Sequence, residues 1–308
     1  MPSQPLTQVF NRGAFIREVF IRATPLTFAL LWSSGFILAR YAAPDADPFT
    51  FLVARFVGAG LILLLLAVAS GAPWPASARG VGHSMMAGAL LHGGYLAGVW
   101  WAVAQGLPAG IAGLITAAQP LLTALLAGPL LGERLTRLQW CGIVAGFVGI
   151  VLVLAPRLAA VEMAALGGVA VPMLANFAGT VSVTLGTFYQ KRFVPVTDLR
   201  TGTCIQYIGA LAVVLPLALA TETLRFEPTA TALAALAWSV LVMSIAAIAL
   251  LLLMIRRGEL SRVATLIYLV PPLTALEAFV LFGESLNAVQ LAGMTVTVVG
   301  VWLATRRG

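Results

Sequence analysis

The chain has 308 residues, of which 60% are hydrophobic and only 9% charged, with a formal net charge of +7. Soluble domains carry about 25% charged residues, so this composition excludes an ordinary soluble domain and indicates a chain embedded in lipid. The basic residues are dispersed at the ends of apolar runs, which favours a membrane surface over a nucleic-acid partner. At about 150 residues per domain, the length is consistent with two units.

The chain begins with a mixed segment, residues 1–23, in which Arg12, Arg17 and Arg22 alternate with large apolar side chains. This predicted cytoplasmic segment is either an amphipathic helix on the membrane surface or a frayed cationic tail. No small-residue cleavage site follows the first apolar run, so we expect no signal peptide.

The rest of the chain divides into apolar runs bounded by charged residues, Pro or Gly. A helix needs about 20 apolar residues to cross a bilayer. Most of the 18 Arg and Lys residues fall in alternate loops, which predicts cytoplasmic N- and C-termini and an even number of crossings. The predicted transmembrane helices are 24–41, 49–70, 81–104, 108–131, 137–155, 165–189, 201–220, 231–254, 261–282 and 287–304.

A duplication organises these helices. Residues 120–152 match residues 271–303 at an offset of 151, without a gap, through a Pro, a Gly-Glu pair, a Gln and two later Gly. The predicted fold is all-α, with ten transmembrane helices in two five-helix repeats, residues 24–155 and 165–304. Because five is odd, the second repeat enters the membrane from the opposite side. Inverted repeats of this kind surround a site near the midplane and support alternating access.

The third predicted helix carries His92 near the bilayer centre, with Tyr95 one turn further on the same face. An ionisable residue at this depth is a functional candidate, either lining a substrate cavity or relaying protons. The alternative is a neutral His bonded to a neighbouring helix.

The sixth predicted helix has a polar stripe at helical spacing, formed by Asn176, Thr180, Thr184 and Thr187. The stripe predicts a hydrated cavity. The alternative is that the Thr hydroxyls bond to their own backbone or hold helices together.

Prolines interrupt the fourth and ninth helices at equivalent places, at Gln119-Pro120 and after Tyr268 at Pro271-Pro272. Paired interruptions indicate a transporter site because irregular backbone at depth must face protein or water. The alternative is two kinks that only shape the packing.

Arg55 and Glu277 are predicted to lie at matched depths within the membrane. They either form an ion pair, or Glu277 holds a proton while Arg55 has a structural or substrate-binding role. Tyr268 and Glu277 lie on opposite faces of a regular helix, so both reach one cavity only if the proline kink rotates the helix.

Two further motifs stand out. Trp32-Ser33-Ser34-Gly35 places an aromatic ring and two hydroxyls at mid-depth in the first helix. Gly142-x-x-x-Gly146 in the fifth helix predicts close packing, at an interface within the chain or between subunits.

These motifs resemble the EamA-type branch of the drug/metabolite transporter superfamily. The resemblance rests on Trp32–Phe36, Arg55-Phe56 and the duplicated block, and covers nearly the whole chain beyond residue 23. It implies ten helices, a central cavity, helices five and ten as scaffold, and export of amino acids, related metabolites or toxic small molecules. Glu277 and His92 do not belong to the family pattern.

The sequence therefore predicts a transporter, an exporter of small polar or amphipathic metabolites, in the bacterial inner membrane. A proton or solute gradient would drive it, because no phosphate-binding G-x-x-x-x-G-K-[ST] motif is present. We expect a monomer or homodimer, and no cofactor, metal ligand or catalytic residue. The rival classes are an intramembrane enzyme, which would need H-E-x-x-H or G-x-S-x-G, and a sensor subunit. The predicted substrate-binding residues are Trp32, Ser34, Arg55, His92, Tyr95, Gln119, Asn176, Thr180 and Tyr268, and the predicted proton-coupling residues are His92 and Glu277.

Overall fold

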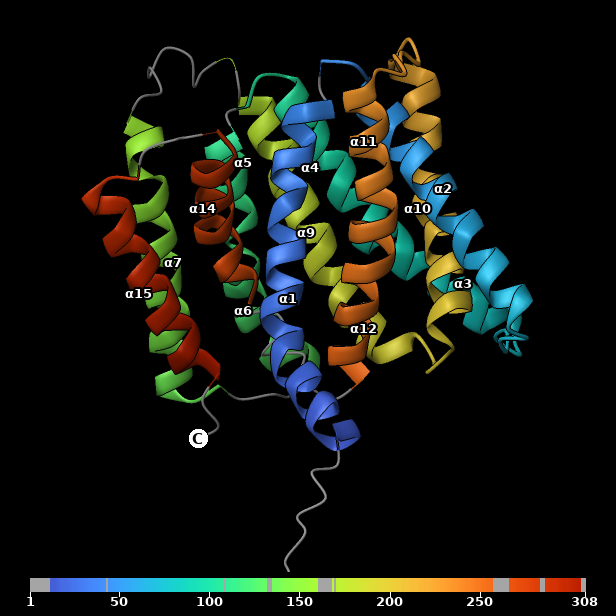
Figure 1. The fold of residues 1–308 in the computed structure, drawn as a ribbon, viewed down its shortest axis with the longest axis horizontal. Helices are drawn as coiled ribbons and strands as arrows, with labels where there is room; N and C mark the ends of the chain where they lie inside the picture. The colour runs from blue at the N-terminus through green and yellow to red at the C-terminus, as the bar shows by residue number, and fades with distance from the viewer. Residues whose placement is uncertain are drawn as a thin grey trace, which may run out of the picture.

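The computed structural model describes residues 12–42, 44–107, 109–131, 135–159, 168, 170–256, 266–282 and 286–305. The described chain is helical and contains no strand; one antiparallel bridge joins Ala46 to Phe226. Figure 1 shows the helices running roughly side by side, with α7 and α15 at one end of the molecule and α2, α3 and α10 at the other.

A helix lies within each predicted range, although several are short or interrupted. The first half contains α1 (Arg12–Ala42), α2 (Pro48–Ala69), α3 (Ala78–Gly88), η1 (Ala89–Gly94), α4 (Tyr95–Ala104), α5 (Ala109–Thr116), α6 (Gln119–Leu131) and α7 (Arg137–Ala159). The second half contains α9 (Ala170–Phe193), α10 (Leu199–Thr221), α11 (Ala230–Trp238), η2 (Ser239–Ala247), α12 (Ile248–Arg256), η3 (Ile267–Leu269), α14 (Val270–Phe282) and α15 (Ala288–Thr305).

Helix α1 differs most from its predicted range. It begins at Arg12 rather than near residue 24 and runs for 31 residues. The helical backbone therefore continues through residues 12–23, which the sequence left open as a surface helix or a tail. Pro25 lies inside the helix without ending it.

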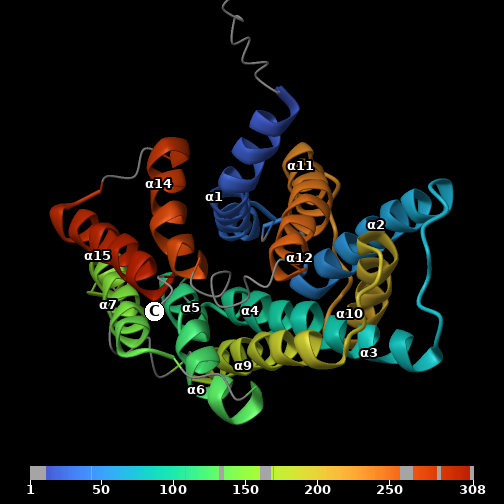
Figure 2. The same ribbon diagram turned by 90° about the horizontal axis from the view of Figure 1, so that it is seen from below.

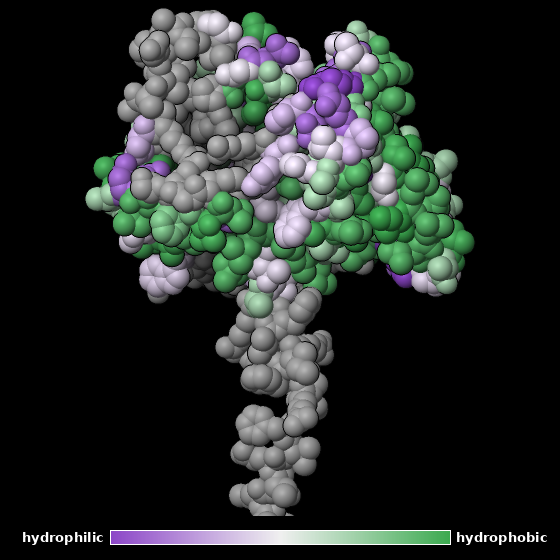
Figure 3. Space-filling view, turned by 45° about the horizontal axis from the view of Figure 1, so that its top comes forward, coloured by the Kyte–Doolittle hydropathy of each residue, from purple (hydrophilic) through white to green (hydrophobic). Residues whose placement is uncertain are grey.

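Four described helical segments are long and apolar enough to cross a bilayer: Pro48–Ala69, Ala170–Phe193, Leu199–Thr221 and Ala230–Leu251. Apolar side chains also face outward, as Leu65 and Val68 of α2 and Val298 of α15 do. Figure 3 shows hydrophobic residues over the sides of the molecule and hydrophilic ones gathered towards one end. Lipid-facing apolar side chains explain this reversal of the soluble pattern.

The duplicated Gln closes a capping box at the start of each repeat's last helix. The Thr136 N–H donates to Gln139 Oε1 at 2.9 Å, and the Gln139 N–H donates to Thr136 Oγ1 at 3.3 Å. Asn287 and Gln290 make the same reciprocal pair, at 3.0 and 2.9 Å. Each pair satisfies two N–H groups that a helix start would leave unbonded. The duplicated Gly-Glu pairs, 132–133 and 283–284, lie outside the described residues.

The duplicated glycines let α7 and α15 touch along their length. Gly142 abuts Gly300, whereas Gly149, two turns further along α7, abuts Gly293. The helices are therefore antiparallel, and the offset of 151 exchanges the two contacts. A Cβ at any of these glycines would overlap backbone of the partner helix. The predicted close-packing face thus serves an interface within the chain.

The other helices contact one another in pairs related by the same exchange. Helix α2 packs against α10, while α4 packs against α9 and α1 packs against α11, η2 and α12. Helix α1 also contacts α14, and α9 contacts α5 and α6. Figure 2 shows α1, α4 and α9 between the α7–α15 pair and the α2–α10 pair.

Candidate functional site

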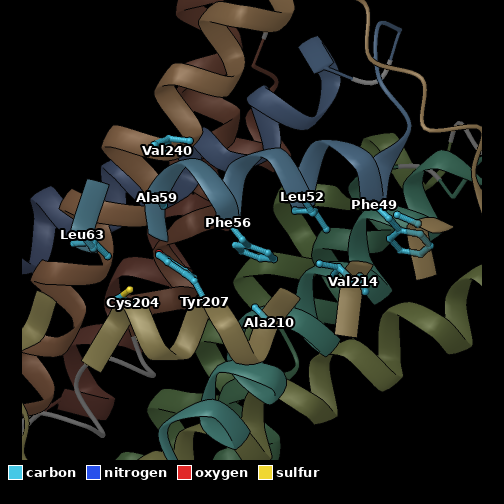
Figure 4. Packing of buried hydrophobic residues seen from close by; sticks show 12 residues of the cluster. Phe49, Leu52, Phe56, Ala59, Leu63, Cys204, Tyr207, Ala210, Val214 and Val240 are labelled. Atoms are coloured by element: carbon cyan, nitrogen blue, oxygen red, sulfur yellow. The ribbon is translucent and has the colours of Figure 1, made fainter. Parts of the chain in front are cut away.

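The α2–α10 crossing brings together two residue pairs that the repeat makes equivalent. Arg55 and Gln206 are 151 positions apart, and so are Phe56 and Tyr207. The Phe56 and Tyr207 rings stack with centroids 5.5 Å apart at an interplanar angle of 22°. Figure 4 shows these two rings facing each other within the hydrophobic cluster that joins the helices.

Arg55 is buried, with 7% of its surface exposed. Its Nε donates to Ser244 Oγ at 2.7 Å, and its Cζ lies 6.0 Å from the centroid of the Phe56 ring. Tyr95 and Tyr207 lie close enough to interact with its charge. Within the described chain, no carboxylate lies within ion-pair distance of this guanidinium.

Ser244 reaches Arg55 from a π-helical segment, η2. The wider π turn changes which backbone groups are paired, and Ser244 Oγ donates to the Ser239 carbonyl at 2.8 Å. The Tyr207 hydroxyl donates in turn to the Ser244 carbonyl. The irregular backbone is thus satisfied by side chains that also hold the Arg55 neighbourhood in place.

His92 lies in the other π-helical segment, η1, and is also buried. Its Nε2 is 3.3 Å from Gln206 Oε1, while Gln206 Nε2 donates to Gln190 Oε1 at 2.9 Å. Because the Gln206 oxygen only accepts, this network assigns the proton to His92 Nε2. His92 also packs against the Tyr207 ring at 5.2 Å.

Close contact between the two helix backbones allows His92 to reach Gln206. A Cβ on Gly88 would overlap the Gln206 carbonyl, and a Cβ on Gly209 would overlap the Met85 carbonyl. The segment from α3 into η1 therefore lies directly against α10, as small residues permit in membrane helices.

The two polar contacts join equivalent helices, although the offset of 151 aligns His92 with Met243 and not with Ser244. In one, Arg55 of α2 meets Ser244 of η2; in the other, Gln206 of α10 meets His92 of η1. The π segments also occupy equivalent places in the third helix of each repeat. Each repeat therefore supplies one polar side chain from its second helix and one from its π segment to the same centre, which we call the central cluster: Arg55, His92, Tyr95, Gln206, Tyr207 and Ser244.

The residues predicted on α1 adjoin this cluster. Trp32, partly buried, packs against the group formed by Tyr95, Val99 and Val183. Ser34 accepts a hydrogen bond from Trp238 Nε1 at 3.0 Å and donates to the Leu31 carbonyl at 2.7 Å. The α1 motif thus faces both the cluster and α11.

Asn176 and Thr180 lie elsewhere, at the contact between α9 and α5. Asn176 Nδ2 donates to the Ala112 carbonyl at 2.9 Å, and Thr116 Oγ1 donates to Asn176 Oδ1 at 3.4 Å. Thr180 Oγ1 donates to the Asn176 carbonyl at 3.0 Å, and Thr184 likewise bonds to its own helix. Asn176 and Thr180 have no exposed surface, and their role in lining a cavity stays a prediction.

Both predicted helix interruptions are present. A turn at 117–118 separates α5 from α6, and the 3₁₀ segment η3 precedes α14. Gln119 is buried at the first interruption, and Tyr268 is fully buried at the second. The Tyr268 ring lies against Gly146 of α7, and its hydroxyl has no hydrogen-bond partner among the described residues. Tyr268 therefore faces the α7–α15 pair.

Glu277 faces α1 rather than Arg55. Ser33 Oγ donates to Glu277 Oε1 at 2.5 Å, whereas Oε2 is buried and has no partner in the described chain. Of the alternatives left open, an ion pair between Arg55 and Glu277 is not formed in this structure.

The structure thus brings Arg55, His92 and Tyr95 together, with Trp32 beside them. Ser34, Gln119, the Asn176–Thr180 pair, Tyr268 and Glu277 lie outside the central cluster. Sequence reasoning missed Gln206, Tyr207 and Ser244. The repeat offset held a signal for the first two, because it aligns Gln206-Tyr207 with the singled-out Arg55-Phe56.

A cavity of about 480 Å³ opens at the loops joining α1 to α2 and α10 to α11, and none of the central-cluster residues lines it. Trp100 lines it and stacks on Phe51 at 5.0 Å, while packing also against the Tyr95 group. The cavity is lined by Ala46, Asp47, Pro48, Trp100, Trp101, Val103, Ala104, Gln105, Thr221, Glu222, Thr223 and Arg225.

Hydrogen bonds hold these two loops together. Glu222 accepts from the backbone N–H groups of Phe49 and Thr50, both at 2.7 Å, which caps the start of α2. Asp47 Oδ2 accepts from the Arg225 N–H and from Thr223 Oγ1, both at 3.0 Å. Burial works to raise the pKa of Asp47, but these bonds and the Arg225 charge together lower it below its ordinary value.

No cluster of His, Cys, Asp and Glu in the described residues has the arrangement of a metal site. A chain whose described residues are helical, with an apolar exterior and several helices long enough to cross a bilayer, is a multi-pass membrane protein. The chain belongs to the EamA-like transporter family, which it matches over residues 23–155 and 171–306. This match establishes the resemblance seen in the sequence.

Three relatives illustrate the family. The chain is 25% identical to an inner membrane transporter of Escherichia coli, YedA, over 90% of this chain and 87% of that protein. It is 25% identical to a transporter of Synechocystis over the same shares. A protein of Salmonella typhimurium named as a probable amino-acid metabolite efflux pump is 26% identical over 68% of this chain and 72% of its own length. A solved crystal structure shares the fold, with a TM-score of 0.71 and 22% identity over 92% of this chain and 96% of that one.

Proposed function

We propose that the protein exports small metabolites, such as amino acids or related polar and amphipathic solutes, across the bacterial inner membrane by alternating access. The observation that carries the proposal is the central cluster, in which both repeats supply polar side chains to one buried point. Polar groups at such depth are expensive, and in a transporter they mark the solute pathway. The efflux pump named among the relatives supports the direction and the solute class.

Inversion of the two repeats is part of this proposal. The α7–α15 contact supports it, because equivalent helices run antiparallel while equivalent glycines exchange places. A two-fold axis that relates antiparallel helices runs perpendicular to them, and so in the plane of the membrane. Ten crossings with both termini in the cytoplasm are the topology that this arrangement and the distribution of Arg and Lys favour.

In such a protein the same site opens to each side in turn. We assign the lining to the nine predicted residues together with Gln206, Tyr207 and Ser244. Those of the central cluster contact the solute first, and those at the two helix interruptions are reached as the repeats move. The cavity at Trp100 is then the vestibule on the outer side.

A proton gradient is the proposed driving force, with a solute gradient as the alternative. Glu277 is the better supported proton carrier, because its buried Oε2 has no partner in the described chain and a neutral carboxyl suits such a place. His92 is the second candidate, since it is buried and held by Gln206. Either residue would bind a proton in one conformation and release it in the other.

The family match favours transport over the rival classes of intramembrane enzyme and sensor subunit. The test is counterflow with purified protein in liposomes, using amino acids, nucleosides and organic cations with and without a pH gradient. Accumulation of at least one class supports the proposal. If no class moves, the transporter proposal is wrong for these solutes and for this driving force.

A further inference from the structure

We propose that Arg55 is the anchor for a carboxylate group on the transported solute, so that the substrates are carboxylic acids or amino acids rather than amines or neutral amides. This inference rests on the proposed function and names the substrate class of its central cluster.

The first argument is electrostatic. Arg55 carries a permanent positive charge in a buried place, and a buried charge is tolerated only when an opposite charge or several hydrogen bonds compensate it. Its one hydrogen bond goes from Nε to the neutral Ser244, and no described carboxylate lies within ion-pair distance. The Phe56 ring adds only a weak attraction, at 6.0 Å. The missing partner is an anion.

The second argument is access. The buried side-chain atoms that lack a partner in the described chain are Ser84 Oγ, Tyr268 OH and Glu277 Oε2. These three atoms are both inaccessible and unbonded. The two terminal nitrogens of Arg55 are also unbonded within the described chain, where only Nε has a partner, but they do not belong to this inaccessible group. These nitrogens therefore keep some accessible surface. Their N–H groups form a planar fork that matches the two oxygens of a carboxylate.

The third argument is that most of the neighbouring polar groups are already bonded. Gln206 joins His92 to Gln190, and the Tyr207 hydroxyl bonds to the Ser244 carbonyl. Among the described residues, these bonds leave the Arg55 guanidinium as the charged donor of the cluster that can still bond to a solute, next to the neutral Tyr95 hydroxyl. Because the equivalent residue of the other repeat is the neutral Gln206, Arg55 is the one permanently charged side chain of the central cluster, which suits the cluster to one carboxylate.

Matched solutes isolate the carboxylate. We would measure binding of leucine against leucinamide, and of 4-methylpentanoate against 4-methylpentanamide, to the purified full-length protein by calorimetry. Each pair differs at the carboxyl group, and the second pair contains no ammonium. We expect the acids to bind on the order of 10- to 100-fold more tightly than the amides, as a hydrogen-bonded charge implies.

Variants then assign the preference to Arg55. Arg55→Gln, which copies the equivalent residue, is expected to remove the preference, and Arg55→Lys to retain part of it because the charge remains. Arg192→Gln is the matched control, because Arg192 is exposed at the end of α9. Thermal melting reports whether each variant is folded, and if Arg55→Gln is not, the wild-type and Arg55→Lys values decide.

The outcomes separate this inference from the proposed function. If amides or amines bind and move as well as the acids, the anchor is wrong while transport stands. The same holds if Arg55→Gln keeps the full preference. If none of the solutes, nucleosides and organic cations included, binds or moves, the proposed function fails and the anchor fails with it.

Discussion

At the residue scale, burial and hydrogen bonding separate side chains that look alike in the sequence. Asn176 and Arg55 are both polar and buried, but Asn176 bonds to the backbone of α5, whereas the terminal nitrogens of Arg55 have no hydrogen-bond partner among the described residues. His92 is held by Gln206, a residue 114 positions away. Helical spacing cannot predict such partners, because it places a residue on a face without saying which helix lies opposite.

The Ser33–Glu277 contact predicts the effect of removing the carboxyl group. In Glu277→Gln we expect transport along a solute gradient to continue but acceleration by a pH gradient to be lost, because an amide cannot bind and release the proton. In the same liposomes, counterflow measures transport along the solute gradient, and uptake driven by a pH gradient measures the acceleration. Ser33→Ala is the control, since it removes the hydrogen bond and keeps the carboxyl. An undiminished pH response in Glu277→Gln would exclude Glu277 as the carrier.

Asp47 predicts a pH dependence of stability. A lowered pKa in the folded protein means that the stabilisation is fully present above the ordinary Asp value near 4 and is lost as the pH falls through the lowered value. The loss should stay under about 1 kcal/mol, because the Arg225–Asp47 pair is partly exposed. The melting temperature should fall more steeply between pH 6 and about pH 3 for the wild type than for Asp47→Asn. Equal slopes would contradict the assignment.

At the scale of the elements, the described part of the duplicated block has a structural role. Its Gln residues cap α7 and α15, and its glycines let these two helices pack closely. The interruptions at Gln119 and before α14 could be predicted because proline leaves a visible signal. The π segments η1 and η2 could not, because one widened turn barely alters the apolar pattern.

The α7–α15 contact predicts a large difference between two similar substitutions. A Cβ at Gly149 would overlap the Thr297 backbone, whereas a Cβ at Gly113 of α5 meets nothing within 4 Å. Gly149→Ala should lose about 1–3 kcal/mol through overpacking, while Gly113→Ala should be neutral or slightly stabilising. Thermal melting in detergent compares the two. Equal melting temperatures would show that the α7–α15 contact relaxes without cost.

At the scale of the whole molecule, the two repeats contact each other through most of their helices, and the two pairs of equivalent helices, α2–α10 and α7–α15, lie at opposite ends of the protein (Figure 2). The repeat could be predicted because an ungapped match is a strong signal, whereas apolar length gave the start of α1 about a dozen residues too late. The grouping of the candidate residues could be predicted only in part: Arg55, His92 and Tyr95 lie together, but the Tyr268 side chain turns away from them towards α7. Whether these residues come together depends on how the two repeats pack, and the periodicity within one helix carries no information about that packing.

The central claim is that the repeats are inverted, and the two capping boxes allow a direct measurement. In a chain with Cys141 and Cys204 replaced by Ala, a single Cys is placed at Thr136 or at Asn287, which are equivalent and exposed at the starts of α7 and α15. A membrane-impermeant thiol reagent is then applied to right-side-out and inside-out vesicles. We predict that Thr136→Cys reacts from the cytoplasmic side and Asn287→Cys from the outer side. Reaction of both from the same side would contradict the account.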